Sequence, residues 1–200
     1  VEGTRNLMRA LAGQALVHQF WVSSASVYGQ SQGEWVDADM PAQPGSDTAH
    51  ELLAAEAVAQ AAGWPCSIVR FGGLYGRGRH WLLRWVTSGR PVQSQPPSWS
   101  NRIHVEDAAG FLEHLVTLAL ANQLLRAIYI GVDDAPTPQH EVLLWLAEQL
   151  ACQPLLTETK PGASQGKRLS NTCLHDSGYA LRYPNCRAGY AQVLAERETQ

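Results

Sequence analysis

Hydroxyl side chains gather directly after a short apolar run near the start of the chain. The run, 18–22, is rich in strand-forming residues, and the overlapping stretch 22–29 reads Val-Ser-Ser-Ala-Ser-Val-Tyr-Gly. A buried strand that ends in small hydroxyl residues is how an open α/β sheet presents polar groups at its carboxyl edge, where ligands bind. The stretch 22–29 therefore predicts a strand end that either does chemistry with its hydroxyls or only holds a ligand.

The rest of the pattern predicts the elements that position this strand end. Apolar residues at helical or strand spacing, with Gly and Pro as breaks, define the elements. Helices are predicted at 1–12, 49–62, 80–88, 106–121 and 137–150, short helical pieces at 171–177 and 187–196, and strands at 18–22, 65–71 and 127–132. Thr48 and Glu51 have the spacing of a capping box, which predicts Thr48 as the N-cap of helix 49–62.

The order of these elements favours an α/β fold with a doubly wound parallel sheet. A strand, a helix and a second strand with short links form a βαβ unit, so the first two strands should be parallel. The polar stretch 30–45 predicts a loop and the proline-rich stretch 89–100 an irregular lid. We interpret Trp81, Trp85 and Trp99 as lid packing, and sugar-stacking surfaces are the alternative. With only three strong strands, one sheet edge is expected to stay unpaired, which invites aggregation.

Composition narrows the class of protein. The 200 residues suit one domain, and the net charge of −3 gives no reason to expect nucleic acid or an anionic membrane as partner. No apolar run approaches the ~18–20 residues of a membrane span. The four cysteines, Cys66, Cys152, Cys173 and Cys186, show no C-x-x-C spacing, so we interpret them as free thiols of a reducing cytosol and expect a soluble cytoplasmic protein.

Four short stretches, in this order, are similar to a known enzyme family. They are 1–7 (Val-Glu-Gly-Thr-Arg-Asn-Leu), 22–29, 70–76 (Arg-Phe-Gly-Gly-Leu-Tyr-Gly) and 102–107 (Arg-Ile-His-Val-Glu-Asp). Together they resemble the later two-thirds of an extended short-chain dehydrogenase/reductase of the NAD-dependent epimerase/dehydratase family. The tail, with 167–171 (Lys-Arg-Leu-Ser-Asn), resembles the atypical members of that family whose active site is altered.

The resemblance implies a Rossmann-like fold that binds NAD or NADP. Residues 1–131 would form part of the NAD(P)-binding domain, with a lid segment at 76–101, and residues 132–200 a substrate-side region. The family binds the dinucleotide pyrophosphate at a G-x-x-G-x-x-G turn after its first strand. No such turn occurs in these 200 residues, so we expect a truncated form whose cofactor requires a segment upstream of Val1.

The resemblance also implies roles for individual residues. Ser24 stands at the position of the catalytic serine, whose hydroxyl binds the reacting oxygen. The implied cofactor-binding residues are Val22, Ser23, Phe71 and Gly72, and the implied substrate-binding residues are Tyr28, Gly73 and Arg102. Arg102 would pair with a phosphate or carboxylate. His104 and Asp107 match a structural motif that ties the sheet edge to a helix start, and no metal site is expected.

Each of these residues also has a purely structural interpretation. Ser24 could satisfy backbone groups at the strand end, and Tyr28 could cap the core. The two glycines could serve only a bend between strand and loop. Arg102 could form a surface salt bridge. The sequence leaves these alternatives open.

The usual proton-transfer pair of the family is absent. Counting back from Glu56 along its helix places Thr48 and Leu52 where the family has a Tyr and, four residues on, a Lys, and no tyrosine of the chain is followed by Lys at that spacing. A positioned acid or base contributes about 10²–10⁴ in rate. His50 and Glu51 are candidate substitutes, although a solvated first-turn role is the simpler interpretation, so the proton donor stays unidentified.

Two main hypotheses of function follow. The chain is part of an NAD(P)-dependent oxidoreductase, epimerase or dehydratase that acts on a nucleotide sugar or similar polar metabolite, or it is a non-catalytic NAD(P)-binding sensor or scaffold. A third hypothesis is a protein-interaction module. A homodimer is left open.

Overall fold

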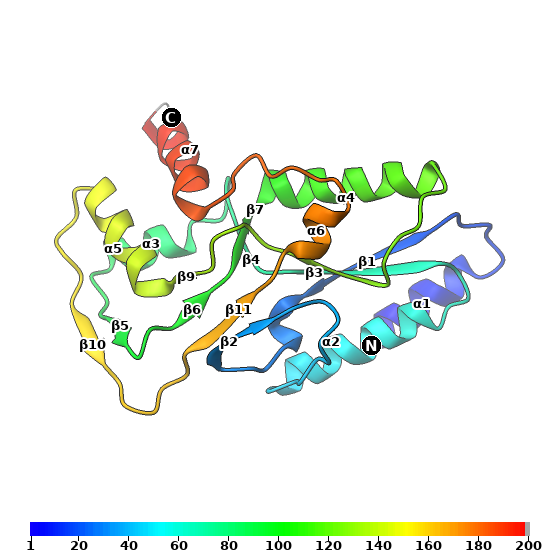
Figure 1. Ribbon diagram of the computed structural model, residues 1–200, viewed down its shortest axis with the longest axis horizontal. Coiled ribbons are helices and arrows are strands. Elements are labelled where there is room, and N and C mark those ends of the chain that lie inside the picture. Colours follow the sequence, from blue (N-terminus) through cyan, green and yellow to red (C-terminus); the bar gives the residue numbers. More distant parts are fainter. Residues whose placement is uncertain (199–200) are drawn as a thin grey trace.

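Three parallel strands form the sheet at the centre of one half of the molecule (Figure 1). They are β1 (Gln19–Ser24), β3 (Cys66–Phe71) and β8 (Ile128–Gly131), paired in the order β1-β3-β8. These are the three strands that the sequence predicts, and their parallel pairing confirms the expected βαβ unit. The computed structural model describes residues 1–198, so residues 199–200 of the predicted region 132–200 lie outside the described part.

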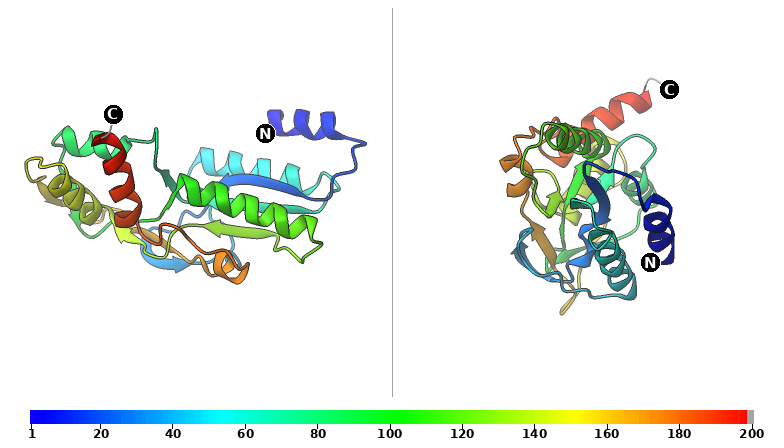
Figure 2. Two further views of the ribbon diagram at one scale, coloured as in Figure 1. Left: turned by 90° about the horizontal axis from the view of Figure 1, so that it is seen from above. Right: turned by 90° about the vertical axis from the view of Figure 1, so that its right-hand side faces the viewer.

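Two helices cover opposite faces of this sheet, so the fold is doubly wound as predicted. α2 (Asp47–Gln60) lies on one face and α4 (Val105–Leu120) on the other, while α1 (Glu2–Leu11) packs beside α2 (Figure 2). Buried alanines let α2 approach the strands closely, and Phe111 and Leu115 of α4 lie in the shared core. Among the described residues, no helix is long and apolar enough to cross a bilayer.

A second hydrophobic core lies at the other end of the molecule, on the left in Figure 1. It is enclosed by α3 (Trp81–Thr87), α5 (Gln139–Gln149) and α7 (Cys186–Glu198), beside the parallel pair β5 (Val92–Gln95) and β10 (Thr157–Thr159). Leucines of α3 and α5 are fully buried there. The predicted lid segment 76–101 therefore packs with residues of the predicted region 132–200.

Short strands connect the two halves. One sheet has the order β2 (Gln32–Val36), β11 (Gly166–Leu169), β6 (Trp99–Ser100) and β9 (Thr137–Pro138), and a parallel pair joins β4 (Gly73–Tyr75) to β7 (Arg102–His104). A short helix, α6 (Thr172–Asp176), follows β11. The predicted loop at 30–45 and irregular lid at 89–100 were wrong where they contain β2, β5 and β6. These strands are two to five residues long and pair with distant segments, so their local sequence carries little signal.

The helix start at α2 also differs from the prediction. Ser46 is the N-cap, and its hydroxyl accepts the N–H of Ala49 at 3.2 Å, so the capping role predicted for Thr48 is wrong. Ser46 lies three residues before Ala49, which is the ordinary N-cap geometry. His50 Nδ1 donates to the carbonyl oxygen of Ser46 at 2.9 Å, and the Glu51 side chain is 70% exposed, so both occupy exposed first-turn positions.

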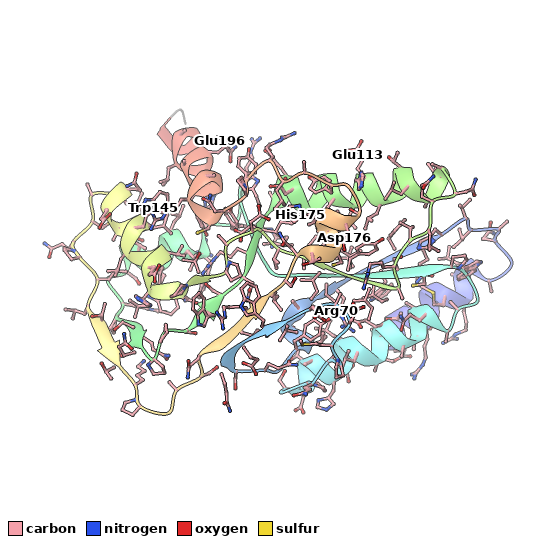
Figure 3. The ribbon with its side chains drawn as sticks, in the orientation of Figure 1. Arg70, Glu113, Trp145, His175, Asp176 and Glu196 are labelled. Carbon is pink, nitrogen blue, oxygen red and sulfur yellow. The ribbon has the colours of Figure 1, made fainter. Side chains whose placement is uncertain are left out.

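A buried ion pair joins α2 to the sheet directly behind the hydroxyl-rich strand end. Arg70 of β3, labelled in Figure 3, donates to both carboxylate oxygens of Glu56 at 3.1 and 2.6 Å, and the two side chains are about 95% buried. Ser23 donates to the same carboxylate at 2.6 Å. The hydroxyl of Tyr28 accepts from Arg70 at 2.7 Å, so four buried polar side chains satisfy one another.

Removing one member of this network should be costly. Glu56→Ala leaves the Arg70 guanidinium buried without its partner, which typically destabilises a protein by about 3–5 kcal/mol. Urea unfolding followed by circular dichroism measures the loss. Glu51→Ala, on the exposed side of the same helix, is the matched control and should change the free energy of unfolding by less than about 0.5 kcal/mol. Equal losses in the two variants would contradict a structural role for the pair.

Candidate functional site

A cavity of about 320 Å³ lies at the carboxyl ends of β1 and β3, and we call it the strand-end cavity. Its walls come from four segments that lie far apart in the sequence. Its lining residues are Ser24, Ala25, Ser26, Phe71, Gly72, Gly73, Trp99, Ser100, Asn101, Lys167 and Leu169. The structure thus brings together four of the eight predicted site residues, at the sheet edge where the sequence placed them.

Ser24 satisfies a backbone group at the strand end, as its structural interpretation holds, and it also lines the cavity. It caps the short 3-10 turn Ala25–Val27, and its hydroxyl oxygen accepts the N–H of Ser26 at 3.2 Å. A hydroxyl that accepts a backbone N–H still carries its own proton as a donor. Ser24 lines the cavity and is half-buried, so this proton is available to an oxygen of a ligand.

Asn101 fixes three walls of the cavity relative to one another. Its backbone oxygen accepts the N–H of Gly73 at 2.9 Å, and its side chain donates to the Lys167 carbonyl at 2.9 Å and accepts the Leu169 N–H at 2.7 Å. A Cβ on Gly72 would lie 2.9 Å from the same Asn101 oxygen, so only glycine permits this approach. The bend at Gly72 is therefore a packing requirement, and Gly72 still lines the cavity.

Besides Arg102, three predicted site residues do not line this cavity. Val22 is 52% exposed on β1, at the edge of the three-stranded sheet. The Ser23 hydroxyl is bound to Glu56 behind the strand end. Tyr28 is fully buried with its hydroxyl on Arg70, so Tyr28 has the core position that was one of its two interpretations.

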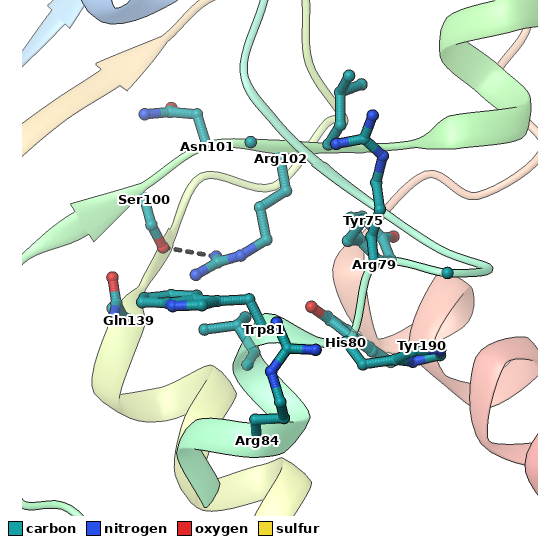
Figure 4. A pocket seen from close by; sticks show the side chains of 14 residues that line it. Tyr75, Arg79, His80, Trp81, Arg84, Ser100, Asn101, Arg102, Gln139 and Tyr190 are labelled. Carbon is teal, nitrogen blue, oxygen red and sulfur yellow. Dashed lines mark hydrogen bonds between the residues drawn. The ribbon is translucent and has the colours of Figure 1, made fainter.

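A second cavity of about 480 Å³ adjoins the first, and we call it the arginine cavity (Figure 4). The two cavities share Gly73, Ser100 and Asn101 among their lining residues. Arg102 is directed into the arginine cavity from β7, only 7% exposed, and donates to the Ser100 hydroxyl at 2.5 Å. No carboxylate among the side chains of residues 1–196 forms an ion pair with it, so the surface salt bridge that was one of its two interpretations is not formed there.

Further cationic and aromatic side chains line the arginine cavity. Arg79 follows β4 and Arg84 lies on α3, while Trp81 is 55% exposed and contacts the Trp85 ring edge-on at 5.0 Å between centroids. Guanidinium groups bind phosphate and carboxylate through paired hydrogen bonds, and an exposed indole offers a flat apolar surface. The cavity is thus suited to an anionic ligand that carries a planar ring.

His104 and Asp107 have the structural role that the sequence predicts. The imidazole of His104 caps α4 by accepting the N–H of Glu106 at 3.3 Å. The buried Asp107 carboxylate accepts the backbone N–H groups of Arg182 and Tyr183 at 2.8 and 2.9 Å. These contacts tie the start of α4 to the segment before α7. Within the described residues, no group of His, Cys, Asp and Glu side chains is placed to hold a metal ion.

Asp133 lies behind Arg102 and was not predicted from the sequence. Its backbone N–H donates to the Arg102 carbonyl at 2.7 Å, and its carboxyl is 2% exposed. One carboxyl oxygen accepts the N–H of Ala135 at 3.1 Å, while the other has no hydrogen-bond partner among the described residues. Burial raises the pKa of Asp133 to about 7, although the Ala135 N–H and the charge of Arg102 act in the opposite direction.

Solved structures with the same architecture are known, whereas no protein-family model matches the chain and no curated protein matches it significantly. The chain is similar to a Methylobacillus flagellatus protein assigned to the NAD-dependent epimerase/dehydratases, with 36% identity, 98% of this chain and 70% of that chain covered, and a TM-score of 0.86. A Silicibacter pomeroyi protein of unknown function is 28% identical, with 98% and 72% covered and a TM-score of 0.82. MoeE5 in complex with UDP-glucose and NAD shares the fold at 22% identity, with 100% and 72% covered and a TM-score of 0.79.

The buried Asp133 carboxyl predicts a pH dependence of stability. Its pKa of about 7 in the folded state lies above the ordinary 3.8, so the folded protein retains a proton that the unfolded chain releases. The free energy of unfolding should therefore fall as the pH rises from about 4 to 7, by roughly 1 kcal/mol per pH unit, and level off above 7. Asp133→Asn, which keeps the acceptor for Ala135, should remove this slope.

Urea unfolding at several pH values between 4 and 8 measures the slope. Asp176→Asn, at an exposed carboxylate, is the control and should leave the slope unchanged. Parallel curves for the wild type and Asp133→Asn would show that Asp133 titrates normally.

Proposed function

The chain belongs to the NAD-dependent epimerase/dehydratase family, and from this membership we propose that it binds NAD(P) and takes part in redox chemistry on a nucleotide sugar or similar polar metabolite. The observation that carries the proposal is the pair of adjoining cavities. The strand-end cavity has the hydroxyl of Ser24 at its wall, and the arginine cavity has the unpaired guanidinium of Arg102. In this proposal residues 1–131 belong to the cofactor-binding domain and residues 132–200 to the substrate side.

The strand-end cavity fits the nicotinamide end of the cofactor. Its volume of about 320 Å³ leaves room for a small aromatic ring with its amide, and its walls combine apolar and polar groups as ligand pockets do. Phe71 and Gly72 would pack against the ring. When bound, the nicotinamide supplies a hydride or accepts one. Ser24 would hold the reacting oxygen of the substrate through its free hydroxyl proton.

The arginine cavity fits the anionic part of the substrate. Arg102, Arg79 and Arg84 would neutralise phosphate groups, and Trp81 would stack on a planar base. Because the cavities share three lining residues, one extended ligand can place its phosphates at the arginines and its sugar at Ser24. A nucleotide sugar has this shape and charge.

The non-catalytic alternative rests on a specific observation. Thr48 is exposed in the first turn of α2, and Leu52 packs against the core at the position of the family's Lys. Neither side chain can transfer a proton at neutral pH. An NAD(P)-binding sensor would need the two cavities but would not need a proton donor.

Replacing Ser24 separates the two alternatives. In the protein produced from its complete reading frame, Ser24→Ala should lower kcat/KM for reduction of a 4-keto nucleotide sugar by about 10²–10³, because a donor to the developing oxyanion is lost. NADH or NADPH consumption is followed by absorbance. Ser24→Thr keeps a hydroxyl and should lose much less. Cofactor binding without any turnover across a panel of nucleotide sugars would favour the sensor, and no cofactor binding would contradict both.

Replacing Arg102 tests the anion site without turnover. Arg102→Met should weaken binding of UDP, measured by calorimetry, at least about 10-fold, because charge-assisted hydrogen bonds to phosphate are lost from a buried position. Arg90→Met, at an exposed arginine outside the cavity, is the matched control. Unchanged UDP affinity in Arg102→Met would remove the arginine cavity as the phosphate site.

A further inference from the structure

We propose that Lys167 is the proton donor of the strand-end cavity and contacts the same substrate oxygen as Ser24. This inference rests on the proposed function and supplies the acid that Thr48 and Leu52 cannot provide. Three observations carry it: the placement of Lys167, its lack of a partner, and the rigidity of the strand that holds it.

Lys167 lines the strand-end cavity from β11, where the register with β2 shifts between Gly166 and Arg168. Leu169 is buried in the core that contains Ala25 and Phe71, and both Leu169 and Lys167 line the strand-end cavity. The guanidinium of Arg168 lies about 5 Å from the Trp35 and Trp99 ring centroids.

The ammonium group of Lys167 has no partner of its own. Among the described residues that line the strand-end cavity, Lys167 alone has an ionisable side chain, and with the side chains of residues 1–196 its Nζ forms no hydrogen bond or ion pair. Burial lowers the pKa of Lys167, although the charge of Glu34 on β2 acts in the opposite direction. A half-buried ammonium group that forms no hydrogen bond or ion pair favours an oxygen-rich ligand beside it.

The backbone around Lys167 is held firmly. The Asn101 side chain binds the carbonyl of Lys167 and the N–H of Leu169, as described above. Gly166 has a φ of +63°, and a Cβ there would collide with the Trp99 carbonyl oxygen, so glycine is required for this close approach. The backbone of Lys167 is therefore held in a fixed position at the cavity wall.

The proton balance of the step is complete. Lys167 gives one ammonium proton to the carbonyl oxygen of the substrate, while the carbonyl carbon accepts a hydride from the reduced nicotinamide. The C=O double bond becomes a single bond, one C–H and one O–H bond form, and the nicotinamide is oxidised. The neutral amine then regains a proton from water. In the reverse direction the neutral amine accepts the proton of the alcohol, which a lowered pKa makes possible near neutral pH.

Site-resolved labelling tests the placement without measuring turnover. A trace pulse of acetic anhydride acetylates neutral amines, and mass spectrometry resolves Lys167 from Lys160. Lys160 is 54% exposed and lies 2.9 Å from Glu158, so it serves as the internal reference. Lys167 should become reactive at a lower pH than Lys160. Nicotinamide mononucleotide, with its binding followed by tryptophan fluorescence, should slow labelling of Lys167 several-fold and leave Lys160 unchanged.

Variants test the chemical role. Lys167→Met should lower kcat by about 10²–10⁴ with little change in cofactor Kd or Tm. Lys167→Arg keeps the charge and should preserve KM, but the limb of the pH–rate profile that Lys167 sets should move or vanish. Lys160→Met is the control and should behave as the wild type.

The outcomes separate this inference from the proposed function. If nicotinamide mononucleotide binds but does not protect Lys167, or if Lys167 titrates with Lys160, the inference is overturned. The same holds if Lys167→Met keeps its kcat while Ser24→Ala loses it, and in each of these cases the proposed function stands. If neither the mononucleotide nor NAD(P) binds the wild type, the proposed function fails and Lys167 loses this role with it.

Discussion

The site depends on the buried pair of Glu56 and Arg70. Taking two charges out of water is expensive, and the cost is offset here because both carboxylate oxygens and all three guanidinium nitrogens have a hydrogen-bond partner. Glu56 meets this requirement through Arg70 and Ser23, and Arg70 through Tyr28 as well. The network fixes the distance between α2 and the strands just behind Ser24. It also explains why two polar residues of the hydroxyl-rich stretch belong to the scaffold and only Ser24 and Ser26 reach the cavity.

The larger elements could be predicted from sequence because their signals are local. The apolar strands at β1, β3 and β8 and the apolar stripe of α4 follow from spacing alone. The short strands could not be predicted in the same way. Gln32–Val36 is polar and becomes a strand only because β11, more than a hundred residues later, pairs with it. The start of α2 was missed because Ser46 and Thr48 are both acceptable caps, and local spacing does not choose between them.

The candidate site could be predicted only in part, because only some of its residues are placed by local signals. Ser24, Phe71, Gly72 and Gly73 end their strands at one sheet edge, so parallel topology alone brings them together. Asn101 and Lys167 come from segments whose position depends on tertiary packing. The sequence signals for Lys167 were its place in the stretch 167–171 and the scarcity of lysine in a chain with two in all, and neither gives it a role at the site. Burial, which decides the pKa of Asp133 and Lys167, leaves no signature at a single position of the sequence.

The position of β1 has a consequence for how the site can be extended. In the sheet order β1-β3-β8 of the described residues, β1 offers one full edge of backbone N–H and C=O groups to a further strand. A parallel strand added there would end level with Ser24, and the residues after it would form a new wall of the strand-end cavity. A strand that pairs with β1 would therefore also help to determine which ligands can bind beside Ser24.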